Sequence, residues 1–272
     1  MSIESLIDSY KQEIDSIKSK FNIERKLLSK SKFSGKIAAV DSGIFRVQLG
    51  RMLYARIKVR GVLFDYSNSV LKAHNEIRLE PYFDIQIFSN EEDWRKKLNE
   101  ERIKAEYELL FHIYEVYHPD ILLVDGSFIP PYFSNSLLDI TSKLLKLPVY
   151  AISKNTSSNQ LTSKLGLNMG DQWILAYILK NSEYTLPKKD KNPWLDFYFT
   201  YIKTTFLPFK VEFKSDVYLL DVLSLIVNSS YKFGYPWIMY EVDRLARIRK
   251  TDIIDIKQIL KRKFRRILRY DE

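Results

Sequence analysis

The segment ILLVDGSF at residues 121–128 constrains the fold more strongly than any other part of the sequence. Four consecutive aliphatic residues are typical of a β-strand that is buried on both faces of a sheet. This strand ends at Asp125, which is followed at once by Gly126 and Ser127. A carboxylate at the end of a buried strand is costly to desolvate unless a positive charge meets it. The segment therefore predicts a sheet with a cation-binding position at its edge.

The elements around this strand alternate between strands and helices. Strands are predicted for KIAAVDSG, which Asp41 is expected to close, for the alternating residues 46–67 and for residues 82–89. A long helix over 92–117 precedes ILLVD, and a helix near 134–146 and the strand PVYAIS, ending at Lys154, follow it. This order predicts an α/β fold with a mixed sheet and helices packed on it.

The C-terminal half adds further predicted elements. QWILAYIL, DFYFTYIKT and FKVEF are predicted as strands, DVYLLDVLSLIVNSS as a buried helix, and residues 237–250 as another helix. No linker-like stretch divides the chain, so we expect an amphipathic helical arm over residues 1–34 and one domain over 35–272. The arm either packs on this domain or serves a dimer or another partner. The domain includes a last amphipathic helix with one strongly basic side.

The charge of the chain points to a polyanionic partner. The 272 residues include 43 Lys and Arg against 34 Asp and Glu, which gives a net charge of +9. Such a surface favours nucleic acid. Cysteine is absent, which excludes disulfides and thiolate metal sites, and no apolar run approaches the ~20 residues of a membrane span. We therefore expect a cytoplasmic protein that does not contact the membrane.

Asp41 and Asp125 share one local pattern, because each follows an apolar strand and precedes small residues. If the two strands are neighbours, the two carboxylates meet at one edge of the sheet and repel each other unless a cation lies between them. A divalent metal ion meets this requirement. The alternative is that each aspartate only caps its own turn.

A third carboxylate is expected from the helix over 92–117. The short connection makes this helix antiparallel to the next strand, in which Asp125 lies five residues beyond Asp120. That distance is ~17 Å at strand rise and corresponds to about eleven helical residues at ~1.5 Å each. Moving back along the helix by this distance reaches Glu106, with Glu108 as the alternative. Both are ordinary surface glutamates if the prediction is wrong.

A fourth carboxylate comes from GYPWIMYEVDRLARI, residues 234–248. A helix that starts just after Pro236 places Asp243 two turns from its beginning. There Asp243 either completes an acidic cluster or forms a surface pair with a neighbouring arginine.

The segments AAVDSG, ILLVDGSF, VYAISK and GYPWIMYEVDRLARI, with a glutamate-bearing helix between the first two, resemble the NurA nucleases in order and separation. The resemblance spans roughly residues 36–250, and VDGS and the Tyr-Pro segment are its most specific elements. It implies a ribonuclease H-like core with a manganese-dependent acidic site. It also implies a homodimer with 5′-to-3′ exonuclease and single-strand endonuclease activity on DNA ends, beside a hexameric HerA-type translocase.

The resemblance also assigns roles to individual residues. Asp41, Glu106 or Glu108, and Asp125 look like the metal-binding carboxylates of the family, and Tyr235 looks like its active-site tyrosine. Two positions depart from the family pattern. The first motif is Asp-Ser-Gly where the family more often has Asp-Gly-Ser, and Asp243 occupies the place of a histidine. A carboxylate there can still bind metal, but it cannot donate a proton as an imidazole does.

The leading hypothesis is two-metal hydrolysis of DNA in end resection and double-strand break repair. Asp41 and Asp125 would bind both ions, Glu106 and Asp243 would complete separate shells, and oxygen ligands favour Mn²⁺ or Mg²⁺. Lys154 either orients the scissile phosphate or is an ordinary lysine at a strand end. The basic side of the last helix is expected to contact backbone phosphates. Its residues include Lys257, Lys261, Arg262, Arg265 and Arg266.

Three alternatives stay open at this point. The chain can be a catalytically weakened paralogue that acts as a DNA-binding or complex-forming subunit. It can be a ribonuclease or another polynucleotide hydrolase on the same scaffold, or a purely structural partner of a translocase.

Overall fold

The structure is a computed structural model of the 272-residue chain. It describes residues 22–249 apart from 30, 32, 50–51, 68–69, 80–81, 88–89, 131–132, 155, 157, 166–169 and 232–233, together with scattered positions between 4 and 19.

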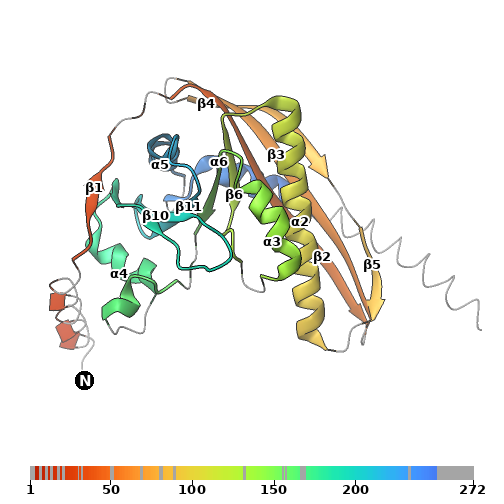
Figure 1. The fold of residues 1–272 in the computed structure, drawn as a ribbon, viewed down its shortest axis with the longest axis horizontal. Helices are drawn as coiled ribbons and strands as arrows, with labels where there is room; N and C mark the ends of the chain where they lie inside the picture. The colour runs from red at the N-terminus through yellow and green to blue at the C-terminus, as the bar shows by residue number, and fades with distance from the viewer. Residues whose placement is uncertain are drawn as a thin grey trace, which may run out of the picture.

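Among the described residues, one mixed sheet of 11 strands forms the centre of the molecule (Figure 1). Its strands follow the order β1, β8, β10, β11, β7, β6, β2, β3, β4, with β5 paired to β3 and β9 paired to β10. Strand β6 runs parallel to both β2 and β7, and the other ladders are antiparallel. The strands are β1 (Arg25–Leu27), β2 (Gly35–Leu49), β3 (Met52–Ser67), β4 (Val70–Leu79), β5 (Tyr82–Ile87), β6 (Ile121–Asp125), β7 (Val149–Ser153), β8 (Glu183–Thr185), β9 (Lys188–Lys189), β10 (Tyr198–Lys203) and β11 (Pro208–Phe213).

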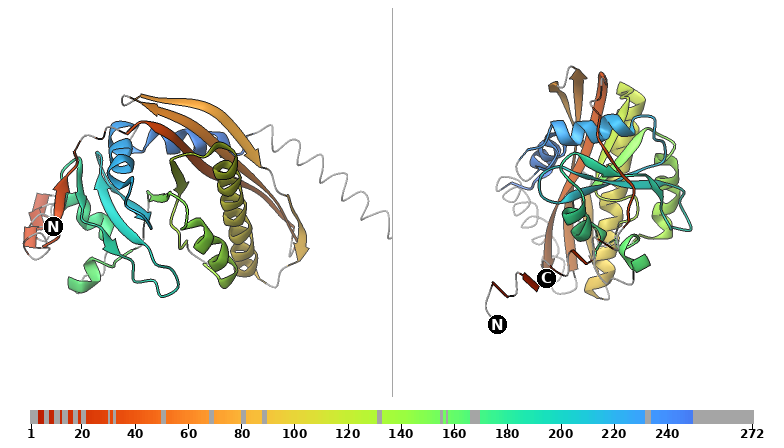
Figure 2. Two further views of the ribbon diagram at one scale, coloured as in Figure 1. Left: turned by 45° about the horizontal axis from the view of Figure 1, so that its top comes forward. Right: turned by 90° about the vertical axis from the view of Figure 1, so that its left-hand side faces the viewer.

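Helices cover both faces of this sheet (Figure 2). Helices α2 and α3 contribute to the hydrophobic core on one face, and α5 and α6 contribute to the core on the other. A smaller cluster lies beneath α4. The helices are α2 (Glu91–Tyr117), α3 (Asn135–Leu144), α4 (Asp171–Ile178), α5 (Leu219–Asn228) and α6 (Trp237–Ala246), with a 3₁₀ turn at Thr162–Leu165. This arrangement confirms the predicted α/β class with a mixed sheet flanked by helices.

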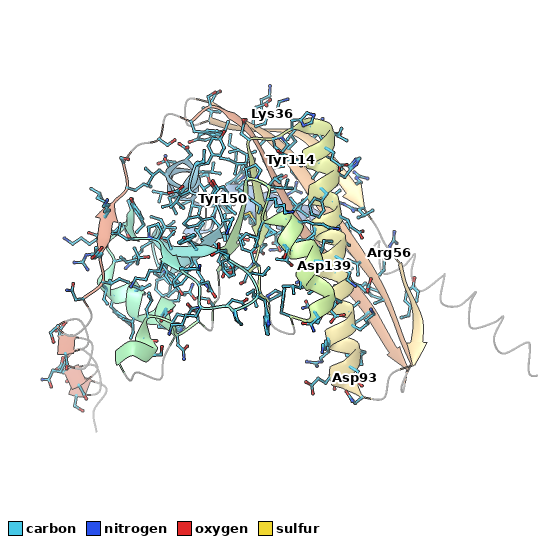
Figure 3. The ribbon with its side chains drawn as sticks, in the orientation of Figure 1. Lys36, Arg56, Asp93, Tyr114, Asp139 and Tyr150 are labelled. Carbon is cyan, nitrogen blue, oxygen red and sulfur yellow. The ribbon has the colours of Figure 1, made fainter. Side chains whose placement is uncertain are left out.

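The central parallel strands are apolar because both of their faces are covered. In β6, Leu122 and Val124 face the core with α2 and α3, whereas Ile121 and Leu123 face the core with α5 and α6. All four side chains are at most 2% exposed. Side chains fill the layers on both sides of the sheet (Figure 3). The buried run ILLV was therefore a reliable signal for a central strand.

The expectation that Asp41 closes its strand is wrong. Strand β2 continues past Asp41 to Leu49, because β3 pairs with it along its whole length, from Gly35 opposite Tyr66 to Leu49 opposite Met52. The parallel pairing with β6 ends one residue earlier, with Val40 opposite Val124. Asp41 thus lies where the pairing of β2 with β6 ends. The chain does not turn there, as predicted, but continues beside β3.

The prediction of a strand for QWILAYIL is also wrong, because these residues lie in α4 and just beyond it. Ile174, Leu175 and Ile178 are buried, whereas Trp173 and Tyr177 are 53% and 45% exposed. That spacing is helical, and a short apolar run does not distinguish a strand from a buried helix. Strand β4 was not predicted, since lysine, asparagine, glutamate and arginine interrupt its apolar residues.

The predicted helices at the two ends lie mostly outside the described residues. Described positions between 4 and 19 are helical and exposed, but the apolar stripe of the predicted arm is not among them. The basic C-terminal helix, with Lys257, Lys261, Arg262, Arg265 and Arg266, lies wholly outside the described residues. Within the described part of the chain, every helix is too short or too polar to cross a lipid bilayer.

Candidate active site

Asp41 and Asp125 lie side by side at one edge of the parallel strand pair. The register of β2 and β6 ends with Val40 opposite Val124, so the next residue of each strand is an aspartate. Asp41 is 8% exposed, and the side chain of Asp125 is 15% exposed. Two acidic side chains with little access to solvent, at adjacent strand ends, repel each other unless positive charge compensates them.

Glu106 reaches the same edge from α2. Its side chain is buried, accepts a hydrogen bond from the Ser42 hydroxyl, and forms an ion pair with Arg102, whose Nη1 lies 2.6 Å from Oε1. Glu108, the alternative from sequence, is exposed to solvent. The structure therefore brings Glu106 to the two aspartates and leaves Glu108 outside.

Helix α6 brings a fourth carboxylate, Asp243, because it packs closely on β2. A side chain at Gly43 would collide with the carbonyl oxygen of Ala246, so the glycine permits the approach of the helix. Asp243 is one of the charges that act on Asp41. It also accepts two hydrogen bonds from Arg247, at 2.9 Å from Nε and 2.5 Å from Nη2. We call Asp41, Glu106, Asp125 and Asp243 the acidic cluster.

The electrostatics of the cluster are unfavourable without additional positive charge. Burial raises the pKa of Asp41 to about 8, and the charges of Glu106, Asp125 and Asp243 add to this effect. A hydrogen bond of 2.7 Å from the Ser42 amide opposes the increase. Burial also raises the pKa of Glu106, although Arg102 and Ser42 act in the opposite direction. The protein has therefore gathered carboxylates where their ionised forms are disfavoured, which is typical of functional sites.

Lys154 and Tyr235 complete the exposed side of the cluster. The Lys154 ammonium lies 3.1 Å from Oδ2 of Asp125 and 3.5 Å from the Tyr235 hydroxyl, and it sits 4.8 Å from the centre of the Tyr235 ring. Burial raises the pKa of Tyr235, and Asp125, Asp41 and Asp243 raise it further. Tyr235 is therefore a neutral hydrogen-bond donor at physiological pH.

The donor set fits a hard divalent cation, because the acidic cluster offers only carboxylate oxygens. Among the described residues, no three His, Cys, Asp or Glu side chains are arranged around one metal position as they stand. Three of the four carboxylates are paired with protein cations instead: Glu106 with Arg102, Asp125 with Lys154, and Asp243 with Arg247. For these carboxylates to bind a metal ion, they must give up their ion pairs with the arginine and lysine side chains.

Sequence reasoning missed Arg102 and Ser42. Arg102 precedes Glu106 by one helical turn, and this i, i+4 spacing is the signal that indicates an ion pair on one helix face. Ser42 gave no comparable signal, because its neighbour Gly43 favoured a turn at that point. Its hydroxyl bonds Glu106 only because β2 continues and presents successive residues to opposite faces.

A mixed sheet covered by helices on both faces, with carboxylates gathered where two parallel strands end, defines an α/β protein with an acidic site at the edge of its sheet. The family model described as "NurA domain" matches residues 29–248. The chain belongs to the NurA family of nucleases.

Solved structures agree with this assignment at the level of the fold. The NurA nuclease from Sulfolobus solfataricus is 16% identical, with a TM-score of 0.72 over 97% of this chain and 95% of that chain. A NurA crystallised with manganese is 10% identical, with a TM-score of 0.63 over 94% of this chain and 97% of that chain. A NurA bound to dAMP and manganese is 9% identical, with a TM-score of 0.58 over 92% and 94% of the two chains. A search of curated proteins found no sequence match.

Proposed function

We propose that this chain is a metal-dependent DNA nuclease and that the acidic cluster is its active site. One observation carries the proposal: Asp41 and Asp125 come directly after the last paired residues of two central parallel strands, and Glu106 joins them from a helix. Their mutual repulsion gives the protein a reason to bind divalent cations there. Manganese in two solved NurA structures supports Mn²⁺ as the ion, with Mg²⁺ as the alternative.

Asp41, Asp125, Glu106 and Asp243 are the residues that would hold the metal. Divalent ions bound there supply Lewis-acid stabilisation of the negative charge that develops on phosphate oxygens. Two ions are expected, because the cluster contributes four carboxylates from four different elements. Glu108 does not share this role, since it is exposed on α2.

Lys154 and Tyr235 act on the scissile phosphate in this proposal. Lys154 is 46% exposed and contacts Asp125, so its ammonium can approach a phosphate that lies beside the cluster. Burial and then the neighbouring carboxylates raise the pKa of Tyr235, so it keeps its proton and can donate a hydrogen bond to a phosphate oxygen. The two side chains thereby orient the substrate and balance its charge.

The finer parts of the proposal rest on membership of the NurA family. They are 5′-to-3′ exonuclease and single-strand endonuclease activity on DNA ends in end resection, double-strand break repair and homologous recombination. They also include action as a homodimer with a HerA-type hexameric translocase in the cytoplasm. DNA binding by Lys257, Lys261, Arg262, Arg265 and Arg266 belongs here too, because the sequence places these residues on one side of a predicted helix.

One observation favours a second candidate, a catalytically weakened subunit that binds DNA without cutting it. Asp243 stands where the family resemblance expects histidine, and Arg247 holds its carboxylate with two hydrogen bonds. A carboxylate paired in this way does not donate a proton to a leaving group. The same nuclease assay separates the two candidates.

The test incubates the purified full chain with end-labelled single-stranded DNA, double-stranded DNA and RNA. Each reaction contains Mn²⁺, Mg²⁺ or a chelator, and Asp41→Asn and Asp125→Asn are compared with the wild type. Asp139→Asn is the matched control, because Asp139 is an exposed aspartate on α3 (Figure 3).

The proposal predicts metal-dependent DNA cleavage by the wild type and by Asp139→Asn, and loss of cleavage in the other two variants. Salt-sensitive DNA binding without cleavage supports the weakened subunit instead. Cleavage of RNA alone, or cleavage that survives both cluster substitutions, contradicts the proposal.

A further inference from the structure

A fully buried acid lies next to the active site without belonging to the acidic cluster. Glu212, on the central strand β11, is 0% exposed. A buried carboxylate carries a large desolvation cost, and an apolar residue in the same place often gives equal or greater stability. The contacts of Glu212 therefore need a functional explanation.

Three of those contacts come from the turn that follows Asp125. The Ser127 hydroxyl lies 2.9 Å and 2.8 Å from the two carboxylate oxygens of Glu212, to which it donates its hydrogen. The Phe128 amide donates to Oε2 at 2.8 Å. On the other side, the Lys210 ammonium donates to Oε1 at 2.7 Å and balances the charge. Glu212 thus ties β11 to the two residues that come directly after the Asp125–Gly126 pair.

The turn that Glu212 contacts has a backbone conformation that favours glycine. Gly126 has a φ of +107°, and a Cβ atom there would meet nothing within 4 Å, so backbone conformation rather than space selects glycine. The Gly126 amide bonds the carbonyl of Ile152 at 3.0 Å, which continues the pairing of β6 with β7. Beyond Gly126 the chain leaves the sheet, and Glu212 fixes the first two residues that follow.

We infer that Glu212 is a positioning residue that, through Ser127 and Phe128, fixes the direction of the Asp125 carboxylate toward the divalent ion. This inference rests on the proposed function. Glu212 does not touch the reacting atoms, so its effect passes through the turn. Partners in the second layer around metal ligands commonly act in this way.

The test measures Mn²⁺ binding to the full chain by titration calorimetry without DNA, so the readout does not depend on catalysis. Four variants are compared with the wild type: Ser127→Ala, Ser127→Thr, Glu212→Gln and Thr200→Val. Ser127→Thr keeps the hydroxyl and is the conservative rescue. Thr200→Val is the structural control, because Thr200 is buried on the neighbouring strand β10 and its hydroxyl bonds the Thr185 carbonyl, not Glu212 or Ser127.

The expected result is Mn²⁺ binding weakened by about 10-fold in Ser127→Ala and in Glu212→Gln. The Mn²⁺ affinities of Ser127→Thr and Thr200→Val should stay within about 2-fold of the wild type. A general loss of stability does not explain this difference between the two pairs of variants. Combining Ser127→Ala with Glu212→Gln should weaken binding little beyond the stronger single variant, because both remove the same contact. The nuclease assay should show the same ranking in kcat, with the KM for DNA nearly unchanged.

Three outcomes overturn the inference, and they are distinguishable from one another. If the wild type binds Mn²⁺ and cuts DNA while Ser127→Ala binds as tightly, the positioning role is wrong and the proposed function stands. If Thr200→Val weakens binding as much as Ser127→Ala, the effect reflects stability and the inference is wrong. If the wild type itself binds no Mn²⁺, the proposed function fails and the inference fails with it. Should Glu212→Gln not fold, the Ser127→Ala and Ser127→Thr pair decides the question.

Discussion

Replacing Asp41 with asparagine should stabilise the metal-free protein while abolishing metal binding. Burial and the charges of Glu106 and Asp125 disfavour the ionised Asp41 carboxylate in the fold. Asparagine has the same shape, carries no charge, and can still accept the hydrogen bond from the Ser42 amide. The substitution therefore removes repulsion and leaves the local geometry intact.

The magnitude follows from the pKa of Asp41, which rises from its ordinary value of 3.8 to about 8 in the fold. Between pH 3.8 and pH 7, each pH unit lowers the free energy of unfolding of the wild type by about 1.4 kcal/mol, because Asp41 ionises in the unfolded chain but not in the fold. The upper limit at pH 7 is therefore about 4 kcal/mol, and side-chain relaxation reduces it, so we expect about 2 kcal/mol. For a domain of this size that gain raises Tm by about 4 to 8 °C.

The sign of the pH dependence is fixed by the direction of the pKa change. Folding raises the pKa of Asp41, so this residue does not lower the free energy of unfolding below pH 3.8. It lowers that free energy progressively as the pH rises toward about 8. The advantage of Asp41→Asn in chelator should therefore be largest near pH 8 and less than half as large at pH 5.

The assay is thermal unfolding followed by circular dichroism, at pH 5 and pH 8, with chelator or with Mn²⁺. Mn²⁺ should raise the Tm of the wild type and of Asp139→Asn, and it should leave Asp41→Asn nearly unchanged. A lower Tm for Asp41→Asn in chelator at pH 8, or an equal change at both pH values, would refute the reasoning.

Three further predictions concern single residues around the cluster. Glu106→Gln should abolish Mn²⁺-dependent cleavage and Glu108→Gln should retain it; equal loss in an endpoint nuclease assay would contradict the assignment of Glu106. Lys154→Met should reduce kcat/KM about 10-fold or more, because it removes the positive charge beside Asp125. The same substitution should change the free energy of unfolding, measured in urea, by less than about 1 kcal/mol, because the lysine is half exposed. Gly43→Ala should push the end of α6 away from β2 and destabilise the protein by about 1–3 kcal/mol in the same urea measurement; an unchanged midpoint would show that the helix can shift freely.

The parts of the fold that the sequence predicted are those with a strong local signal. The apolar run before Asp125 gave a central strand because only a sheet covered on both faces buries every side chain of such a run. The long helix over 92–117 was predicted within one residue of its start, and its length placed Glu106 at the edge of the sheet. Both inferences needed only periodicity and element lengths.

The parts that sequence reasoning missed depend on tertiary pairing. Asp41 lies within a long strand because β3 accompanies β2 past the end of β6, and no local pattern around Asp41 reports that partner. Glu212 gave no signal either, since its hydrogen-bond partner Ser127 is far away in the chain and adjacent only in the fold. Helix α4 was missed because its apolar run is too short to show a clear period.

The most direct test of the central claim is anomalous diffraction from crystals of this protein soaked in Mn²⁺. Our account predicts an anomalous peak within about 2.5 Å of carboxylate oxygens from both Asp41 and Asp125, with Glu106 released from Arg102. Peaks that touch only one of the two aspartates, or that lie away from this edge of the sheet, would contradict it.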